Sequence, residues 1–114
     1  PAICDLYGCC FVPDMFWNGL PVLVNDSVLT GQVKRVGEQL PVVDKVVEMD
    51  PLTLGEDFAI YLEELPGAFW TLGVCAPETG QMSPLHNPGM SPDERAIPVG
   101  IEMLVANCLE YFSS

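Results

Sequence analysis

The residue with the clearest chemical potential in this 114-residue chain is its only histidine. His86 lies in the run PLHNP over residues 84–88, so it belongs to a Pro-rich connector and not to the apolar face of a helix. An imidazole can bind a metal ion or polarise a substrate, but a catalytic zinc needs about three protein ligands and an open position. If His86 is a metal ligand, its partners must therefore come from outside these 114 residues. The alternative is an exposed loop histidine without a function.

A second polar cluster, Gly55, Glu56 and Asp57, precedes a short apolar segment. Thr53 and Glu56 have the spacing of a capping box, in which each side chain satisfies a backbone amide at a helix start. Asp57 would complement the positive end of the helix dipole, and Gly55 would permit a tight turn. These structural roles need no catalytic function.

The balance of charges restricts the classes of partner. Sixteen acidic residues against four basic ones give a formal net charge of −12. Such a chain would be repelled by nucleic-acid phosphates and by anionic lipid, so neither partner is expected. The acidity can serve solubility, or it can create a negative field that attracts divalent cations, and the sequence leaves both open. The apolar stretch near the C-terminus is shorter than the roughly 20 residues of a membrane span.

The five cysteines are odd in number and irregular in spacing, and none of them forms a C-x-x-C pair. Reduced thiols and a cytoplasmic location are therefore expected. A nucleophile made of Cys75 and His86 is disfavoured, because no residue near Cys75 would activate its thiol. The chain begins with proline, which indicates a processed or truncated chain.

The apolar pattern predicts alternating strands and helices. A helix from N-cap candidates at 25–27 to residue 40 carries one apolar stripe, Leu29, Val33, Val36 and Leu40. Strands are predicted over 3–12, 42–47 and 68–74, a short helix over 56–65, and a terminal helix from about Asp93. The predicted buried face of the terminal helix comprises Ile97, Ile101, Leu104, Val105, Cys108 and Phe112.

This order of elements predicts a right-handed βαβ unit in an open α/β sheet. Sites in such sheets lie in the loops that follow the carboxyl ends of the strands. Residues 55–57 and the loop of His86 both follow predicted strands. We therefore expect the two polar clusters on the same rim of the sheet.

Several segments together resemble a known enzyme family. They are LGEDFAIYL over 54–62, LPGAFWTLG over 65–73, PLHNP over 84–88, DERAIPVG over 93–100 and PVLVND over 21–26. They resemble the C-terminal catalytic region of M20-type metallopeptidases. The amidohydrolase branch is the most similar, with its hippurate hydrolases, N-acyl-amino-acid amidohydrolases and auxin-conjugate hydrolases. The resemblance covers roughly residues 20–112.

The resemblance implies a hydrolase with two divalent metal ions, zinc or manganese, that cleaves the amide bond of a small N-acyl amino acid. It makes His86 a metal ligand and assigns Gly55, Glu56 and Asp57 a positional role near the substrate site. No catalytic residue is carried over, because the family's metal-binding Cys/His motif, its Glu-Glu pair and its lid histidine have no match here. The isolated chain is therefore expected to be inactive.

The resemblance also implies a domain organisation. Residues 1–20 would be the tail of an inserted lid domain, through which the complete enzyme could form a homodimer, and residues 21–114 would be the C-terminal part of the catalytic domain. Two alternatives stay open. One is a small acidic α/β binding or scaffolding module without activity, and the other is an aminopeptidase or deacetylase of the same superfamily.

Overall fold

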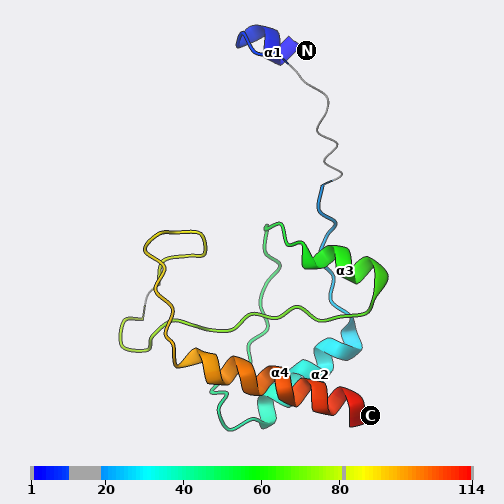
Figure 1. Ribbon diagram of the computed structural model, residues 1–114, viewed down its shortest axis with the longest axis vertical. Helices are drawn as coiled ribbons and strands as arrows, with labels where there is room; N and C mark the ends of the chain where they lie inside the picture. The colour runs from blue at the N-terminus through cyan, green and yellow to red at the C-terminus, as the bar shows by residue number, and fades with distance from the viewer. Residues whose placement is uncertain (1, 11–18, 81, 114) are drawn as a thin grey trace.

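The computed structural model describes residues 2–10, 19–80 and 82–113. Within these ranges it contains four helices, α1 (Ala2–Leu6), α2 (Ser27–Gln39), α3 (Phe58–Glu64) and α4 (Ala96–Ser113), and no β-strand. Long extended segments join the helices, and α2 and α4 cross each other (Figure 1). No helix in the described ranges has the length and apolar character needed to cross a lipid bilayer.

Helix α2 confirms the sequence prediction. The Oδ1 atom of Asp26 accepts hydrogen bonds from the backbone N–H groups of Val28 and Leu29, both at 2.9 Å. This N-cap satisfies amides that have no partner inside the helix. In the predicted stripe Val36 is buried and the other three residues are half-buried. The helix ends at Gln39, two residues before Pro41.

The small core of the protein lies where α2 packs against α4. Val36 and Met103 are almost fully buried at this contact. Gly37 permits the close approach, because a Cβ atom there would lie 2.9 Å from Cγ2 of Val46 and 3.5 Å from Cε of Met103. Buried Gln32 donates a hydrogen bond from Nε2 to the backbone oxygen of Asn107, at 2.9 Å.

The predicted sheet is not formed within the described residues. The segments 42–47 and 68–74 are not strands, because no neighbouring backbone forms a ladder with them there. At Phe69 the side chain of Asn25 replaces a partner strand. The N–H of Phe69 donates to Oδ1 of Asn25, and the C=O of Phe69 accepts from Nδ2 of Asn25, both at 2.8 Å. A period-2 or β-branched pattern indicates an extended backbone but does not supply its partner.

The predicted strand over 3–12 is also wrong for the residues that are described. Residues 2–6 form α1, and the N–H of Tyr7 donates to the backbone oxygen of Ile3 at 3.3 Å. Local hydrogen bonds of this kind satisfy the backbone without a partner strand. Residues 11 and 12 lie outside the described ranges.

Helix α3 is shorter than predicted and does not use the capping box. It begins at Phe58, so Thr53 lies outside its first turn. Glu56 instead accepts a hydrogen bond at Oε1 from the backbone N–H of Phe58, at 3.2 Å. Asp57 occupies the N-cap position without a side-chain cap. Ala59 is the most deeply buried residue of the helix.

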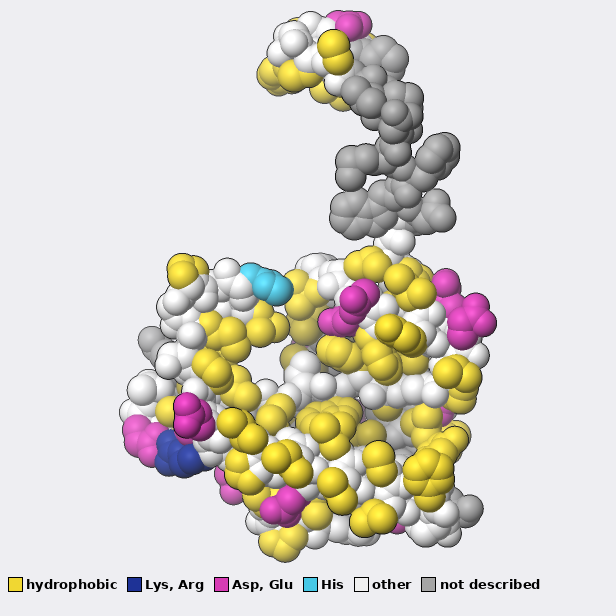
Figure 2. All heavy atoms as spheres, in the orientation of Figure 1, with side chains coloured by type: hydrophobic (Ala, Val, Ile, Leu, Met, Phe, Trp, Pro, Cys, Tyr) yellow, Lys and Arg dark blue, Asp and Glu magenta, His cyan; other side chains and the backbone are white. Residues whose placement is uncertain are grey.

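Helix α4 begins at Ala96, three residues after the predicted start, and Pro98 fits its first turn as expected. The predicted buried face is wrong, because Met103 is the buried apolar residue and the predicted residues lie exposed. Apolar residues surround most of this helix, so its pattern did not select the face that contacts α2. Hydrophobic side chains cover much of the visible surface around α4 (Figure 2).

Candidate functional site

Residues 75–92 form a loop that carries His86, and the two ends of this loop lie next to each other. The backbone N–H of Asp93 donates to the backbone oxygen of Val74 at 2.8 Å, which joins the two ends of the loop. A turn near its start is held by Thr79, whose N–H and hydroxyl both donate to the backbone oxygen of Ala76. The loop therefore has an ordered base next to α4.

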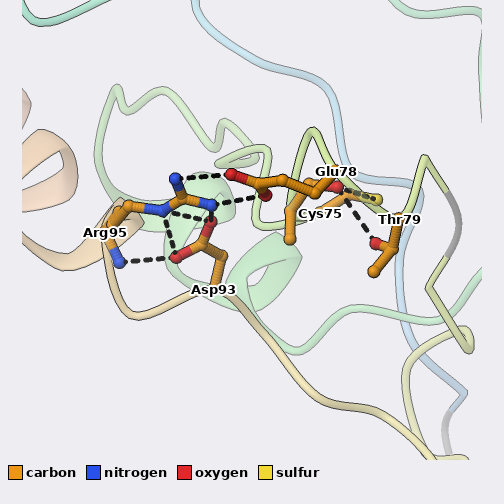
Figure 3. Close-up of polar contacts among 6 residues, drawn as sticks. Cys75, Glu78, Thr79, Asp93 and Arg95 are labelled. Carbon is orange, nitrogen blue, oxygen red and sulfur yellow. Dashed lines mark hydrogen bonds and ion pairs between the residues drawn. The ribbon is translucent and has the colours of Figure 1, made fainter.

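An arginine between two carboxylates strengthens this base, as Figure 3 shows. Nη1 and Nη2 of Arg95 donate to the two carboxylate oxygens of Glu78, at 2.9 and 2.7 Å. Nε of Arg95 donates to both oxygens of Asp93, at 3.0 and 2.8 Å, and the backbone N–H of Arg95 donates to Oδ1 of Asp93 at 2.9 Å. We call Glu78, Asp93 and Arg95 the arginine clamp.

The arginine clamp is charged at neutral pH. Hydrogen bonds from the Arg95 side chain lower the pKa of the Glu78 carboxyl. Hydrogen bonds that the side chain and the backbone N–H of Arg95 donate to Asp93 likewise lower the pKa of the Asp93 carboxyl. The two carboxylates in turn raise the pKa of Arg95 above its usual range. Each group thus stabilises the charged form of the others.

His86 lies at the surface of the loop, where the single histidine of the chain appears in cyan in Figure 2. Its φ angle of 65° is in the left-handed region, which residues other than glycine rarely adopt. The next residue holds this turn, because the N–H of Asn87 donates to the oxygen of Pro84 at 3.2 Å and its Oδ1 accepts from Gly89 at 2.8 Å. Within the described part of the chain the imidazole has no hydrogen-bond or ion-pair partner, so it is free to bind a ligand.

The acidic turn is not assembled with His86 into a metal site. Gly55 and Asp57 are exposed, and Glu56 is half-buried with the Phe58 amide as its partner. Among the residues that the structure describes, no group of three or more His, Cys, Asp or Glu side chains could hold a metal ion. His86 therefore has no complete set of metal ligands around it among the described residues.

Sequence reasoning missed the arginine clamp. The spacing of Asp93 and Arg95, two residues apart before a helix, was visible as a local signal. Glu78 lies 17 residues from Arg95, and no local pattern links them. Asp93 and Arg95 of the clamp border an open hollow, which is also lined by Ala76, Thr79, Met82, Ser83, Gly89, Ser91, Pro92 and Glu94.

Comparison with known families decides the affiliation. Peptidase family M20/M25/M40 matches residues 10–110. The chain belongs to this family. The predicted resemblance is thereby confirmed. Membership of the M20 family implies an α/β peptidase fold, although the described residues form helices and unpaired extended segments.

Curated relatives of this M20 chain bear several names. It is 41% identical over 91 residues to the "Putative glutamate–cysteine ligase 2-3" of Rhodococcus jostii, which covers 80% of the chain and 11% of the relative. It is 42% identical over 96 residues to the N-acetyldiaminopimelate deacetylase of Exiguobacterium sibiricum, a match that covers 84% of the chain and 24% of the relative. It is 38% identical over 80 residues to the N-acetyl-L-cysteine deacetylase of Bacillus subtilis, a match that covers 70% of the chain and 18% of the relative.

The chain therefore spans only about a tenth to a quarter of the length of these three relatives. No solved structure gives a significant match.

Proposed function

We propose that this M20 chain is part of a metal-dependent hydrolase that cleaves the amide bond of N-acyl amino acids. The observation that carries the proposal is the family match over residues 10–110. Two relatives at 42% and 38% identity are named as deacetylases of N-acetylated amino acids, which supports this substrate class.

In this proposal His86 is one metal ligand. An imidazole is a suitable ligand for zinc. That of His86 is exposed and has no partner among the described residues, so a metal ion could reach it. The described residues offer no complete ligand set, so in this proposal the other ligands and the general base come from outside the described residues. A bound pair of divalent ions would supply polarisation of the amide carbonyl.

The acidic turn has a positional role in this proposal. Glu56 accepts the Phe58 amide and so holds the first turn of α3, while the exposed Asp57 adds negative charge beside it. Gly55 has a leucine methyl group, Cδ1 of Leu20, 3.1 Å from the place where its Cβ would be. We assign no proton transfer to these residues.

A chimera tests the role of His86. This chain would replace the matching segment of the N-acetyldiaminopimelate deacetylase of Exiguobacterium sibiricum, to which it is 42% identical over 96 residues. We expect His86→Ala to lower kcat/KM for the acetylated substrate at least about 100-fold, because loss of a ligand exceeds the effect of losing its outer-shell support. Bound zinc, measured by mass spectrometry of the native protein, should fall as well.

Ser91→Ala is the matched control, since Ser91 is exposed on the same loop. It should leave both activity and zinc content unchanged. Equal activity of the His86→Ala and Ser91→Ala chimeras would refute the proposed role. The isolated 114-residue chain with added zinc or manganese should show no turnover above its own His86→Ala variant.

A further inference from the structure

We infer that Arg95 is a positioning residue for His86, a role that rests on the function proposed above. Arg95 does not lie next to His86 in the sequence, and it acts through the loop that carries it. By binding Glu78 and Asp93 at once, it fixes the base of the loop and thereby the place of the imidazole at its tip.

The two carboxylates lie at opposite ends of the loop. Glu78 lies near the start of the loop, and Asp93 follows its last residue. One guanidinium reaches both, with four donor–acceptor distances of 2.7–3.0 Å. The clamp thus ties the beginning of the loop to its end, in addition to the backbone bond from Asp93 to Val74.

The guanidinium of Arg95 has the geometry that this bridge requires. Its planar fork donates two parallel hydrogen bonds to Glu78, a geometry that a lysine ammonium cannot reproduce. A single exposed ion pair contributes little, but here both carboxylates share one cation. The Asp93 side chain is only 13% exposed, whereas the side chains of Arg95 and Glu78 are 63% and 64% exposed.

The tip of the loop forms its hydrogen bonds within itself. Residues 84–90 form a turn with their own hydrogen bonds. The N–H of Asn87 donates to the oxygen of Pro84, and Asn87 accepts from the N–H groups of Gly89 and Met90. This turn sets the local backbone of His86, including its positive φ. It does not set where the turn lies relative to α4, because its hydrogen bonds stay within the tip. The base of the loop must determine that.

Backbone relaxation of the 114-residue chain tests the clamp without any metal. In the wild type, order parameters of residues 76–92 outside the undescribed position 81 should approach the value of about 0.85 that is typical of rigid backbone. In Arg95→Met they should fall to about 0.6 or below, while those of α2 and the second half of α4 stay high. The Hε1 resonance of the single histidine should shift with them.

Arg35→Met is the matched control, because Arg35 is exposed on α2 and far from the loop in sequence. It should leave the loop unchanged. Glu78→Gln removes one arm of the clamp without altering the start of α4, so it reports on the loop even if Arg95→Met fails to fold. A loop that stays equally rigid in Arg95→Met, or in Glu78→Gln where the first variant is unfolded, would overturn the inference.

The chimera described above separates positioning from general stability. Arg95→Met should raise the zinc concentration for half-maximal activity about tenfold, as loss of outer-shell support does, with kcat at saturating zinc nearly unchanged. Arg95→Lys should fall between wild type and Arg95→Met, because it keeps the charge and loses the fork.

The activity, zinc content and zinc requirement of the chimeras distinguish failure of the positioning role from failure of the proposed function. If His86→Ala removes activity but Arg95→Met leaves the zinc requirement unchanged, the positioning role is overturned and the proposed function stands. If His86→Ala has no effect on activity or zinc content, the proposed function is overturned, and the positioning role for catalysis is overturned with it. In that case the backbone relaxation of Arg95→Met would show only that Arg95 anchors the loop.

Discussion

At the scale of single residues, His86 is held by its neighbours and has no polar side-chain contact of its own within the described chain. Asn87 sets its turn, and the arginine clamp sets the base of its loop. Such an arrangement raises the affinity of a ligand for its metal, because an imidazole that is already in position loses less conformational entropy on binding.

The clamp makes the loop sensitive to acid. The pKa values of Glu78 and Asp93 lie below their ordinary values of 4.5 and 3.8 in the folded chain. A lowered carboxyl pKa stabilises the folded state fully above the ordinary pKa, and this contribution is lost as the pH falls through the lower, folded value. Order of the loop should therefore persist from pH 7 to about 5 and decline below about pH 4.

Backbone relaxation at pH 6 and pH 3.5 measures this decline, with the circular dichroism of the helices as the control for general unfolding. In Glu78→Gln the pH dependence should be weaker. Loosening of the loop already above pH 5 would show that other groups hold it.

At the scale of elements, α2 is stabilised by a local cap at its start and by packing on α4. Its start is capped by Asp26, and its apolar stripe meets α4. Asp26→Ala removes an acceptor for two amides and should lower the free energy of unfolding by about 0.5–2 kcal/mol. Asp44→Ala is the matched control, because Asp44 is exposed and outside the helices, and it should stay within about 0.5 kcal/mol of the wild type.

Urea unfolding followed at 222 nm compares the two variants. Equal midpoints for Asp26→Ala and Asp44→Ala would contradict the role of the cap.

An ion pair between Lys34 of α2 and Glu48 joins the helix to the extended segment that follows it. Both side chains are exposed, so we expect this pair to add little to the free energy of unfolding.

At the scale of the whole molecule, the described chain buries few apolar side chains. Val36, Ala59 and Met103 are its buried apolar residues, while residues such as Ile101, Leu104 and Phe112 are more than half exposed. Exposed apolar surface of this extent is unusual for a self-contained domain. It argues against the alternative of a small, independent binding module.

The isolated chain should therefore bind the dye ANS in native buffer, with a clear rise in fluorescence. Leu104→Gln should reduce that rise more than Leu54→Gln, because Leu104 lies among the exposed apolar residues of α4 and Leu54 lies in an extended segment. Both leucines are exposed, so the pair is matched in chemistry. A chain that leaves ANS fluorescence unchanged would contradict the exposed surface.

The sequence by itself determined the features that depend on neighbours along the chain. The Asp26 cap and Pro41 delimit α2, and Pro66 and Gly67 follow the end of α3. The prolines around His86 marked it as a loop residue, and the family motifs identified the M20 affiliation. Each of these signals acts within a few residues, where propensity and capping decide the outcome.

Only the tertiary structure decided what depends on distant partners. The segments 42–47 and 68–74 have strand-like patterns but no ladder in the described chain, because a strand needs a second backbone. Helix α4 is apolar on several sides, so only its packing on α2 selected Met103 for burial. The bond from Arg95 to Glu78 joins residues 17 positions apart, and it exists because the loop folds back onto the start of α4.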